Sequence, residues 1–249
     1  MPIQMPQIPQ IERLDIDILD ADAAEKRLFA SSLGFYRLFW VFLIGSFLGV
    51  VIETIWCFIM YQCFESRAGL VIGPFNPVYG TGAIVLTLGL HPLRKKRDAI
   101  ILVAGGFLGG MVEYASSWIQ QVSLGSTSWD YSDQRFNIGG RTSLLYMFFW
   151  GVLAIIWIKD IYPRLSKLIT KIPMRLGTVL TWIFLLFMVA DCGLSAGAVY
   201  RRAMRLEGVA PKTRADMFFD EVFPDERMDW IYPHMNFGVE KTVDNLPSS

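Results

Sequence analysis

The chain of 249 residues has few of the residues that bind metals or form disulfide frameworks. Its two histidines, His91 and His234, are isolated from one another and from other ligand types, so no metal-binding spacing is present. Its three cysteines, Cys57, Cys63 and Cys192, have no paired spacing and lie in or beside apolar runs, where a thiol is better explained as small apolar filler. We therefore expect no metal site, no disulfide and no cofactor.

Other absences narrow the function classes. The sequence contains no glycine-rich loop that ends in Lys followed by Ser or Thr, so any nucleotide hydrolysis must come from another polypeptide. It has no nucleophile elbow and no histidine cluster, which argues against an enzyme. Its formal net charge is zero, which by itself says nothing about partners. We expect no nucleic-acid partner. The first 37 residues are polar and lack a basic region before a short apolar stretch, so we expect no signal peptide.

Apolar residues, in contrast, are abundant. They make up 53% of the chain, with 14% aromatics and a mean hydropathy of +0.38, which is too apolar for one soluble core but normal for a small polytopic membrane protein. Five segments reach the length of about 17 to 25 mostly uncharged residues that crosses a bilayer. They are roughly residues 38–60, 69–90, 99–119, 142–158 and 176–199. We predict an all-α integral membrane protein with about five transmembrane helices.

These segments divide the chain into three parts. Residues 1–37 form a polar N-terminal segment, residues 38–199 the transmembrane domain, and residues 200–249 a C-terminal tail. Within the transmembrane domain we expect a first repeat at 38–90, a second repeat at 99–158 and an extra helix at 176–199.

The distribution of Lys and Arg predicts the orientation. Residues 94–97 read Arg-Lys-Lys-Arg after the second segment, and residues 159–171 carry four further basic residues after the fourth. Both connections should be cytoplasmic by the positive-inside rule, and so should the N-terminus. We therefore predict a multi-pass protein of the bacterial inner membrane. Five crossings place the tail outside, yet Arg201, Arg202 and Arg205 follow the last segment, which leaves open a sixth crossing, a re-entrant fifth segment or a tolerated exception.

A nine-residue pattern occurs twice in the apolar part of the chain. Gly, one residue, Phe-Leu-Gly, three residues and Glu form residues 45–53 and again residues 105–113, 60 positions later. The spacing of four places both glycines and the acid on one helix face, where helices approach closely. Glu53 and Glu113 would lie about 20 Å from the cytoplasmic ends of their helices. Two crossings separate the copies, so they run in the same direction, which predicts two parallel two-helix repeats.

Each of these acids has two interpretations. Ionisable residues inside a membrane are costly and often serve a substrate or proton path, so Glu53 and Glu113 could face one shared space. Either acid could instead be a helix-packing element, protonated and hydrogen-bonded to a neighbouring backbone.

A proline-rich and glycine-rich stretch precedes the second predicted crossing. Two prolines in residues 73–82 remove backbone donors, and the glycines loosen the helix. We expect a broken helix start or a re-entrant turn, which a membrane tolerates only where protein or water covers the backbone. The residues of this structural turn are Gly73, Pro74, Pro77, Tyr79 and Gly80. Its Phe75-Asn76 dipeptide has a counterpart 61 positions later in Phe136-Asn137.

That counterpart lies in a polar loop on the predicted outer side, residues 129–141. The loop could be an interfacial anchor with a local Asp-Arg clamp, or it could take part in binding. Arg141, at the mouth of the fourth crossing, could pair with Glu113 or Asp130. The predicted substrate or proton path is Glu53, Glu113, Asn137, Arg141, Asp130, Trp129 and Tyr131. Asp191, in the fifth segment, we expect to be structural.

The order of these motifs resembles a known family. Glu53, then Gly73-Pro74 with Pro77, Tyr79, Gly80 and Gly82, then Glu113-Tyr114, then Trp129-Asp130-Tyr131-Ser132 and Phe136-Asn137 with Gly140-Arg141 are similar to the family called "putative ABC transporter permease, type IV". The resemblance covers roughly residues 38–160. It implies a small bacterial multi-pass protein with a role in transport, and it supplies neither a substrate nor catalytic residues.

The sequence therefore favours a permease or a transport-associated subunit with paired intramembrane carboxylates. Its partners would be the lipid bilayer and, through the basic cytoplasmic connections, a separate ATPase subunit; alternatively the two acids could carry protons. An accessory or assembly subunit, in which charges only specify helix pairing, is the alternative. A membrane-embedded enzyme with paired carboxylates as acid and base on a lipid-linked substrate is a third hypothesis, against which the missing motifs count.

Overall fold

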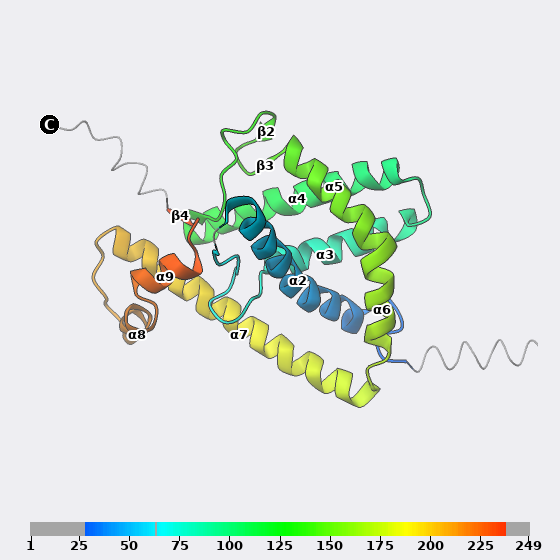
Figure 1. Cartoon of the computed structure of the whole chain (residues 1–249). Helices are drawn as coiled ribbons and strands as arrows, with labels where there is room; N and C mark the ends of the chain where they lie inside the picture. The colour runs from blue at the N-terminus through cyan, green and yellow to red at the C-terminus, as the bar shows by residue number, and fades with distance from the viewer. Residues whose placement is uncertain (1–27, 63, 238–249) are drawn as a thin grey trace, which may run out of the picture.

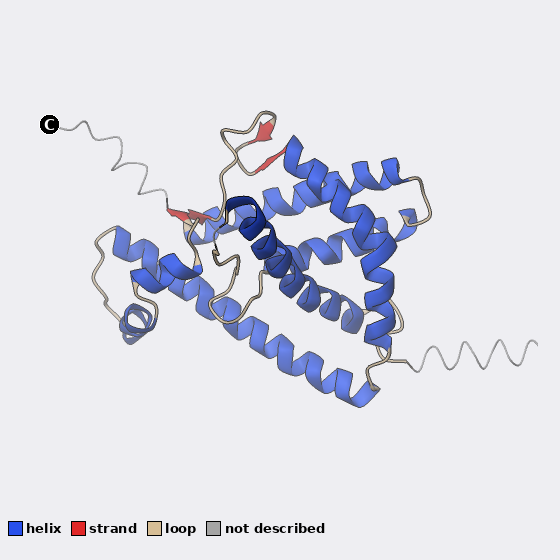
Figure 2. Ribbon diagram, viewed as in Figure 1, coloured by secondary structure: helices blue, strands red, loops and turns tan. Residues whose placement is uncertain are grey.

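The computed structural model describes residues 28–62 and 64–237, and nearly all regular structure in this part of the chain is helical (Figures 1 and 2). The α-helices are α2 (Phe35–Tyr61), α3 (Pro77–Leu90), α4 (Asp98–Leu124), α5 (Leu144–Ile156), α6 (Tyr162–Thr170), α7 (Met174–Leu206), α8 (Arg214–Val222) and α9 (Asp225–Ile231). A 3-10 turn, η1 (His91–Leu93), and a π-helical turn, η2 (Trp157–Ile161), complete them. Most of the predicted segment 1–37, Cys63 and the last part of the tail lie outside the described residues.

Four helices of the described chain are long and apolar enough to cross a membrane. They are Phe35–Met60, Asp98–Leu124, Leu144–Thr170 and Met174–Leu206, where the third joins α5, η2 and α6 into one continuous helix. The predicted helical membrane protein is thus confirmed, and four of its five predicted segments coincide with these helices. The second predicted segment contains α3, whose 14 residues span only about 21 Å against a hydrocarbon core of about 30 Å.

The chain before α3 is irregular and hydrogen-bonds to both α2 and α7. The backbone N–H of Asn76 donates to the carbonyl of Ser46 in the middle of α2 at 3.1 Å. On the other side, the N–H of Ile72 donates to Asp191 Oδ1 of α7 at 3.1 Å. These partners supply the acceptors that an irregular backbone at this depth requires, because lipid offers none.

Local sequence explains where α3 begins. The side-chain oxygen of Asn76 accepts the N–H of Val78 at 3.0 Å, and Pro77 occupies the first helical position, where a missing N–H costs nothing. Gly73 has φ +74°, a left-handed conformation that favours glycine. The turn and the cap therefore fix the entry of the chain into α3.

Helix α2 packs on α3 through glycines. A Cβ added at Gly45 would lie 2.6 Å from the Cβ of Ala83, and one added at Gly49 would lie 2.3 Å from the ring of Tyr79. No side chain fits at either position without moving its neighbour, so the two glycines set the distance between the helices.

Helix α4 packs on α5 in the same way. A Cβ at Gly105 would lie 2.2 Å from the Cβ of Ala154, and one at Gly109 would lie 2.3 Å from the ring of Trp150. The contacting residues on α3 and on α5 are each four positions apart, one helical turn.

The largest buried apolar cluster lies between the helices toward the end that holds the start of the described chain (Figure 1). It includes Phe29, Leu86, Ile101, Ile158 and Ile169. Large apolar side chains are in turn exposed along α2, α4, α5 and α7, as expected for helices that face lipid.

Short two-residue strands connect loops rather than build a sheet (Figure 2). They are β1 (Ser126–Thr127), β2 (Asn137–Ile138), β3 (Thr142–Ser143) and β4 (Asn236–Phe237). Strand β2 pairs with β3 in a hairpin before α5, and β1 pairs antiparallel with β4 from the C-terminal part of the chain.

The end of α7 forms an ion-paired unit with α8 and α9 (Figure 1). Arg201 binds Asp220 through two nitrogens at 2.8 Å each. Arg202 pairs with Asp229, and Arg205 pairs with Asp220 and Asp225. Helices α8 and α9 have 9 and 7 residues, too short to cross a bilayer, so the described part of the tail contains no sixth crossing.

Candidate functional site

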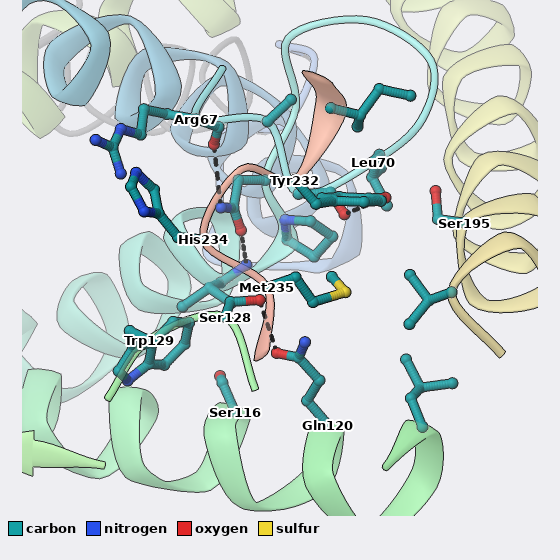
Figure 3. Close-up of a pocket in the computed structure, with 18 of the residues that line it drawn as sticks. Arg67, Leu70, Ser116, Gln120, Ser128, Trp129, Ser195, Tyr232, His234 and Met235 are labelled. Carbon is teal, nitrogen blue, oxygen red and sulfur yellow. Dashed lines mark hydrogen bonds between the residues drawn. The ribbon is translucent and has the colours of Figure 1, made fainter. Parts of the chain in front are cut away.

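A cavity of about 1070 Å³ lies among the loops that follow α2 and α4, the start of α3 and the chain after α9 (Figure 3). Its wall comes from α2, the irregular segment before α3 and the start of α3 itself, together with α4 and the segment after it. The second half of α7 and the chain between α9 and β4 complete it. Of the residues predicted for a path, Glu53, Trp129, Asp130 and Tyr131 line the cavity. The turn residues Pro77 and Tyr79 line it too.

Glu53 lies on the cavity wall in a loose ion pair. Its Oε1 is 3.9 Å from Arg67 Nη1, and its side chain is 34% exposed. Arg67 binds Glu65 more closely, with 3.0 Å between Nη2 and Oε2. His234 extends this network, because its Nε2 lies 2.7 Å from the same oxygen of Glu65. Glu53 is thus the least tightly paired carboxylate of this group and is open to the cavity.

Glu113 is held differently. It is only 6% exposed, and its two oxygens accept hydrogen bonds from the hydroxyls of Tyr131 at 2.9 Å and Thr142 at 2.7 Å. Tyr131 lines the cavity and stacks on Tyr146 with 4.1 Å between ring centroids. Tyr131 therefore links the second acid to the cavity wall.

The charge around Tyr131 connects the two acids. Burial raises the pKa of its hydroxyl well above the ordinary 10.0, and the negative charge of Glu113 raises it further. Glu53 adds to the same upward shift of the pKa, so both carboxylates lie within electrostatic range of one hydroxyl. Tyr131 consequently keeps its proton and acts as a hydrogen-bond donor.

Asn137 organises the loop between α4 and α5 and does not line the cavity. Its amide nitrogen donates to the carbonyls of Ser132 at 3.1 Å and Gln134 at 2.8 Å, and its oxygen accepts the N–H of Gly140 at 3.0 Å. Asn76, its predicted counterpart, caps α3 instead. The two asparagines therefore occupy different structural positions, which the shared dipeptide did not reveal.

Arg141 does not pair with Glu113, and that hypothesis is wrong. Its guanidinium donates to Ser117 Oγ at 3.1 Å and to Gln121, and it lies 5.7 Å above the ring centre of Tyr114. Its carbonyl accepts the indole N–H of Trp129 at 2.8 Å. Both oxygens of Glu113 accept hydroxyl donors instead, and Arg141 binds along the C-terminal part of α4.

The remaining turn residues shape the backbone. Gly73 and Pro74 form the bend before α3, and a Cβ on Gly80 would lie 2.2 Å from Ser46 Oγ in α2. Asp191 of α7 accepts a hydrogen bond from the backbone N–H of Ile72, which agrees with the structural role expected of it.

Two groups of cavity residues escaped the sequence reasoning. Ser116, Gln120 and Ser123 share one face of α4, and their spacing of four and three was a readable signal. Tyr232 and His234 come from the C-terminal tail, whose position no local pattern indicates (Figure 3).

A family model described as "Putative ABC-transporter type IV" matches residues 40–196, more than half of the chain. The match extends beyond the predicted limit of residue 160 and includes most of α7. Together with the four apolar helices it indicates a membrane protein related to transport. Neither the curated proteins nor the solved structures that were compared gave a significant match.

Proposed function

Because the chain belongs to the family described as "Putative ABC-transporter type IV", we propose that it is a permease or a transport-associated subunit whose path begins in the cavity and passes Glu53 and Glu113. One observation carries the proposal: Glu53 stands on the cavity wall, and Tyr131, on the same wall, binds Glu113. A cavity that reaches two acids inside a helix bundle is the arrangement expected of a solute or proton path.

The two acids would belong to parallel repeats, α2–α3 and α4–α5, with α7 as the extra helix. The glycine contacts support this proposal, since Gly45 and Gly49 use partners one turn apart on α3, as Gly105 and Gly109 do on α5. Parallel repeats place equivalent residues around a common axis, where transporters bind their substrates.

For topology we propose a cytoplasmic N-terminus and an outward-facing cavity in the plasma membrane. In this topology the irregular segment and α3 together span the membrane, because α3 alone is too short. They form the fifth crossing, and the end of α7 then lies outside. Arg201, Arg202 and Arg205 are each paired with aspartates of α8 and α9 and form no free basic loop. Labelling Ser248→Cys from outside intact cells tests this, and labelling from inside only would contradict it.

The energy source would be a separate ATPase docked on the basic cytoplasmic connections, or a proton gradient. Support for the first comes from the family and from the Arg-Lys-Lys-Arg sequence at 94–97. Copurification of an ATPase with the chain from its native membrane would support the driven permease.

Transport is tested in sealed membrane vesicles that contain the wild type or the Glu53→Gln/Glu113→Gln variant. Glutamine keeps the size of the side chain and much of its hydrogen bonding while removing the charge. Vesicles receive ATP or a proton gradient, and untargeted mass spectrometry measures the solutes retained. At equal levels of folded protein, we expect the retained amount of at least one solute to change severalfold in wild-type vesicles and not in vesicles with the variant. Identical contents with both energy sources would contradict the proposal.

The hydrogen bonds of Glu113 favour one alternative. An acid with both oxygens satisfied by hydroxyls could serve helix packing alone, as in an accessory or assembly subunit. In that case the glutamine variant would retain full function in every assay of the assembled complex.

A further inference from the structure

The chain between α9 and the end of the described residues crosses the cavity. Residues 232–237, here called the strap, contribute Tyr232, Pro233, His234, Met235 and Asn236 to the cavity wall. Tyr232 and Phe237 at its two ends are buried, at 8% and 2% exposure, while Pro233, His234 and Asn236 between them are exposed. The strap is thus anchored by buried side chains at its two ends and exposed between them.

The strap joins the loops that follow α2 and α4. On one side the hydroxyl of Tyr232 donates to the carbonyl of Gly69 at 3.3 Å, and His234 binds Glu65. On the other side β4 pairs with β1, with Thr127 opposite Asn236. Figure 3 shows His234 beside Arg67, with Ser128 and Gln120 below the strap on the side of α4.

These attachments suit reversible opening. The β1–β4 ladder is two residues long, far shorter than a ribbon that is stable alone. The His234–Glu65 pair is half exposed, and exposed pairs hold weakly. The α-helices of the bundle make their glycine contacts without the strap. Release of Phe237 and the ladder would therefore uncover the cavity while the bundle stays folded.

The strap also lies outside the part of the chain that the family model matches, which ends at residue 196. The cavity is built largely within that part, on α2, α3, α4 and α7, and its C-terminal wall lies outside the match. We propose that the strap is a gate that controls entry to the cavity. The inference rests on the proposed function only in taking the cavity as the entrance of the path.

A reversible cross-link tests the gate. Opposed residues of antiparallel strands have Cα atoms about 4.5 to 5.5 Å apart, within the range that a disulfide spans. The full-length Thr127→Cys/Asn236→Cys variant, in a Cys57→Ser/Cys63→Ser background, can therefore be locked by oxidation and released by reduction. Native Cys192, which lines the cavity, is the probe. Its rate of reaction with a charged, membrane-impermeant maleimide is read by mass spectrometry of the peptide that contains it.

We expect the locked protein to react at least tenfold more slowly than the same protein after reduction. Phe237→Ala without the cross-link should react severalfold faster than the parent background, which provides a second measurement. The variants with only one of the two substitutions, Thr127→Cys or Asn236→Cys in the same background, are the controls. Oxidation should not change the rate at which Cys192 reacts in either of them.

Equal rates in the locked and reduced forms, or no reaction of Cys192 in any form, would overturn the gate. The labelling rate requires no transport. A vesicle experiment in which no solute responds would therefore reject the proposed path without affecting the labelling result. Equal labelling rates would likewise reject the gate without affecting the transport result.

Discussion

The helix pairs α2–α3 and α4–α5 have the same contacts between helices and different surroundings for their acids. In both pairs, two glycines one turn apart pack against an alanine and an aromatic ring of the partner helix. Glu53, however, is 34% exposed beside Arg67, whereas Glu113 is 6% exposed and bound by Tyr131 and Thr142. The difference teaches that glycine spacing determines the packing, while the loops that follow α2 and α4 determine the chemistry of each acid.

The largest effect is expected where the two pairs are alike. Gly49→Leu and Gly109→Leu each force a side chain into an aromatic ring, and overpacking of this kind costs on the order of 3 kcal/mol or more. Both variants should lose most of the folded protein in detergent, measured by size-exclusion chromatography. Gly193→Ala is the control, since nothing lies within 4 Å of its added Cβ. Normal yield of either leucine variant would show that the close contact is not required.

The next effect separates the pairs. Glu113→Ala leaves the hydroxyls of Tyr131 and Thr142 without their acceptor, at about 1 to 3 kcal/mol for each buried group. Glu53→Ala removes a loose, part-exposed pair worth about 0 to 1 kcal/mol. The Tm measured in detergent should therefore fall further for Glu113→Ala than for Glu53→Ala. Equal shifts in Tm would contradict the difference between the two acids.

A smaller effect tests the link between Glu113 and the cavity wall. Tyr131→Phe removes one hydrogen bond and keeps the ring that stacks on Tyr146, so we expect a loss of about 1 kcal/mol. Tyr114→Phe is the matched control, because its ring retains the contact with Arg141. A Tm for Tyr131→Phe equal to that of the control would show that the hydrogen bond contributes nothing.

The sequence predicted the parts of this picture that depend on local spacing. Gly45, Gly49 and Glu53 are one turn apart, so their common helix face follows from helical geometry. The break before α3 follows from Pro74 and Pro77.

What the sequence missed depends on distant contacts. Tyr131 reaches Glu113 across 18 positions and His234 reaches Glu65 across 169, and no local pattern indicates such partners. The sequence offered Glu113 or Asp130 as a partner for Arg141, but the oxygens of Glu113 accept hydrogen bonds from the hydroxyls of Tyr131 and Thr142.

The smallest effect lies outside both helix pairs and concerns the stability of α8 and α9 at low pH. The hydrogen bonds from Arg201 lower the pKa of Asp220 below its ordinary 3.8, and backbone N–H donors from Lys212 and Thr213 lower the pKa of Asp216. Their stabilisation is fully present above pH 3.8 and is lost as the pH falls through the lowered values, because the unfolded state binds protons first. The protection of α8 and α9 against hydrogen exchange, relative to the unstructured chain at the same pH, should therefore fall below about pH 4, before that of α2 and α4. A simultaneous loss of protection in all four helices would contradict this order.

The central claim is that two differently held acids serve one path, and an additivity measurement tests it most directly. For the solute identified in vesicles, transport rates are compared for Glu53→Gln, Glu113→Gln and the double variant at equal levels of folded protein. Residues that act as a unit are strongly non-additive. The account predicts that each single variant lowers the rate at least tenfold and that the double variant is no worse than the slower single one. A wild-type rate for Glu113→Gln would contradict it.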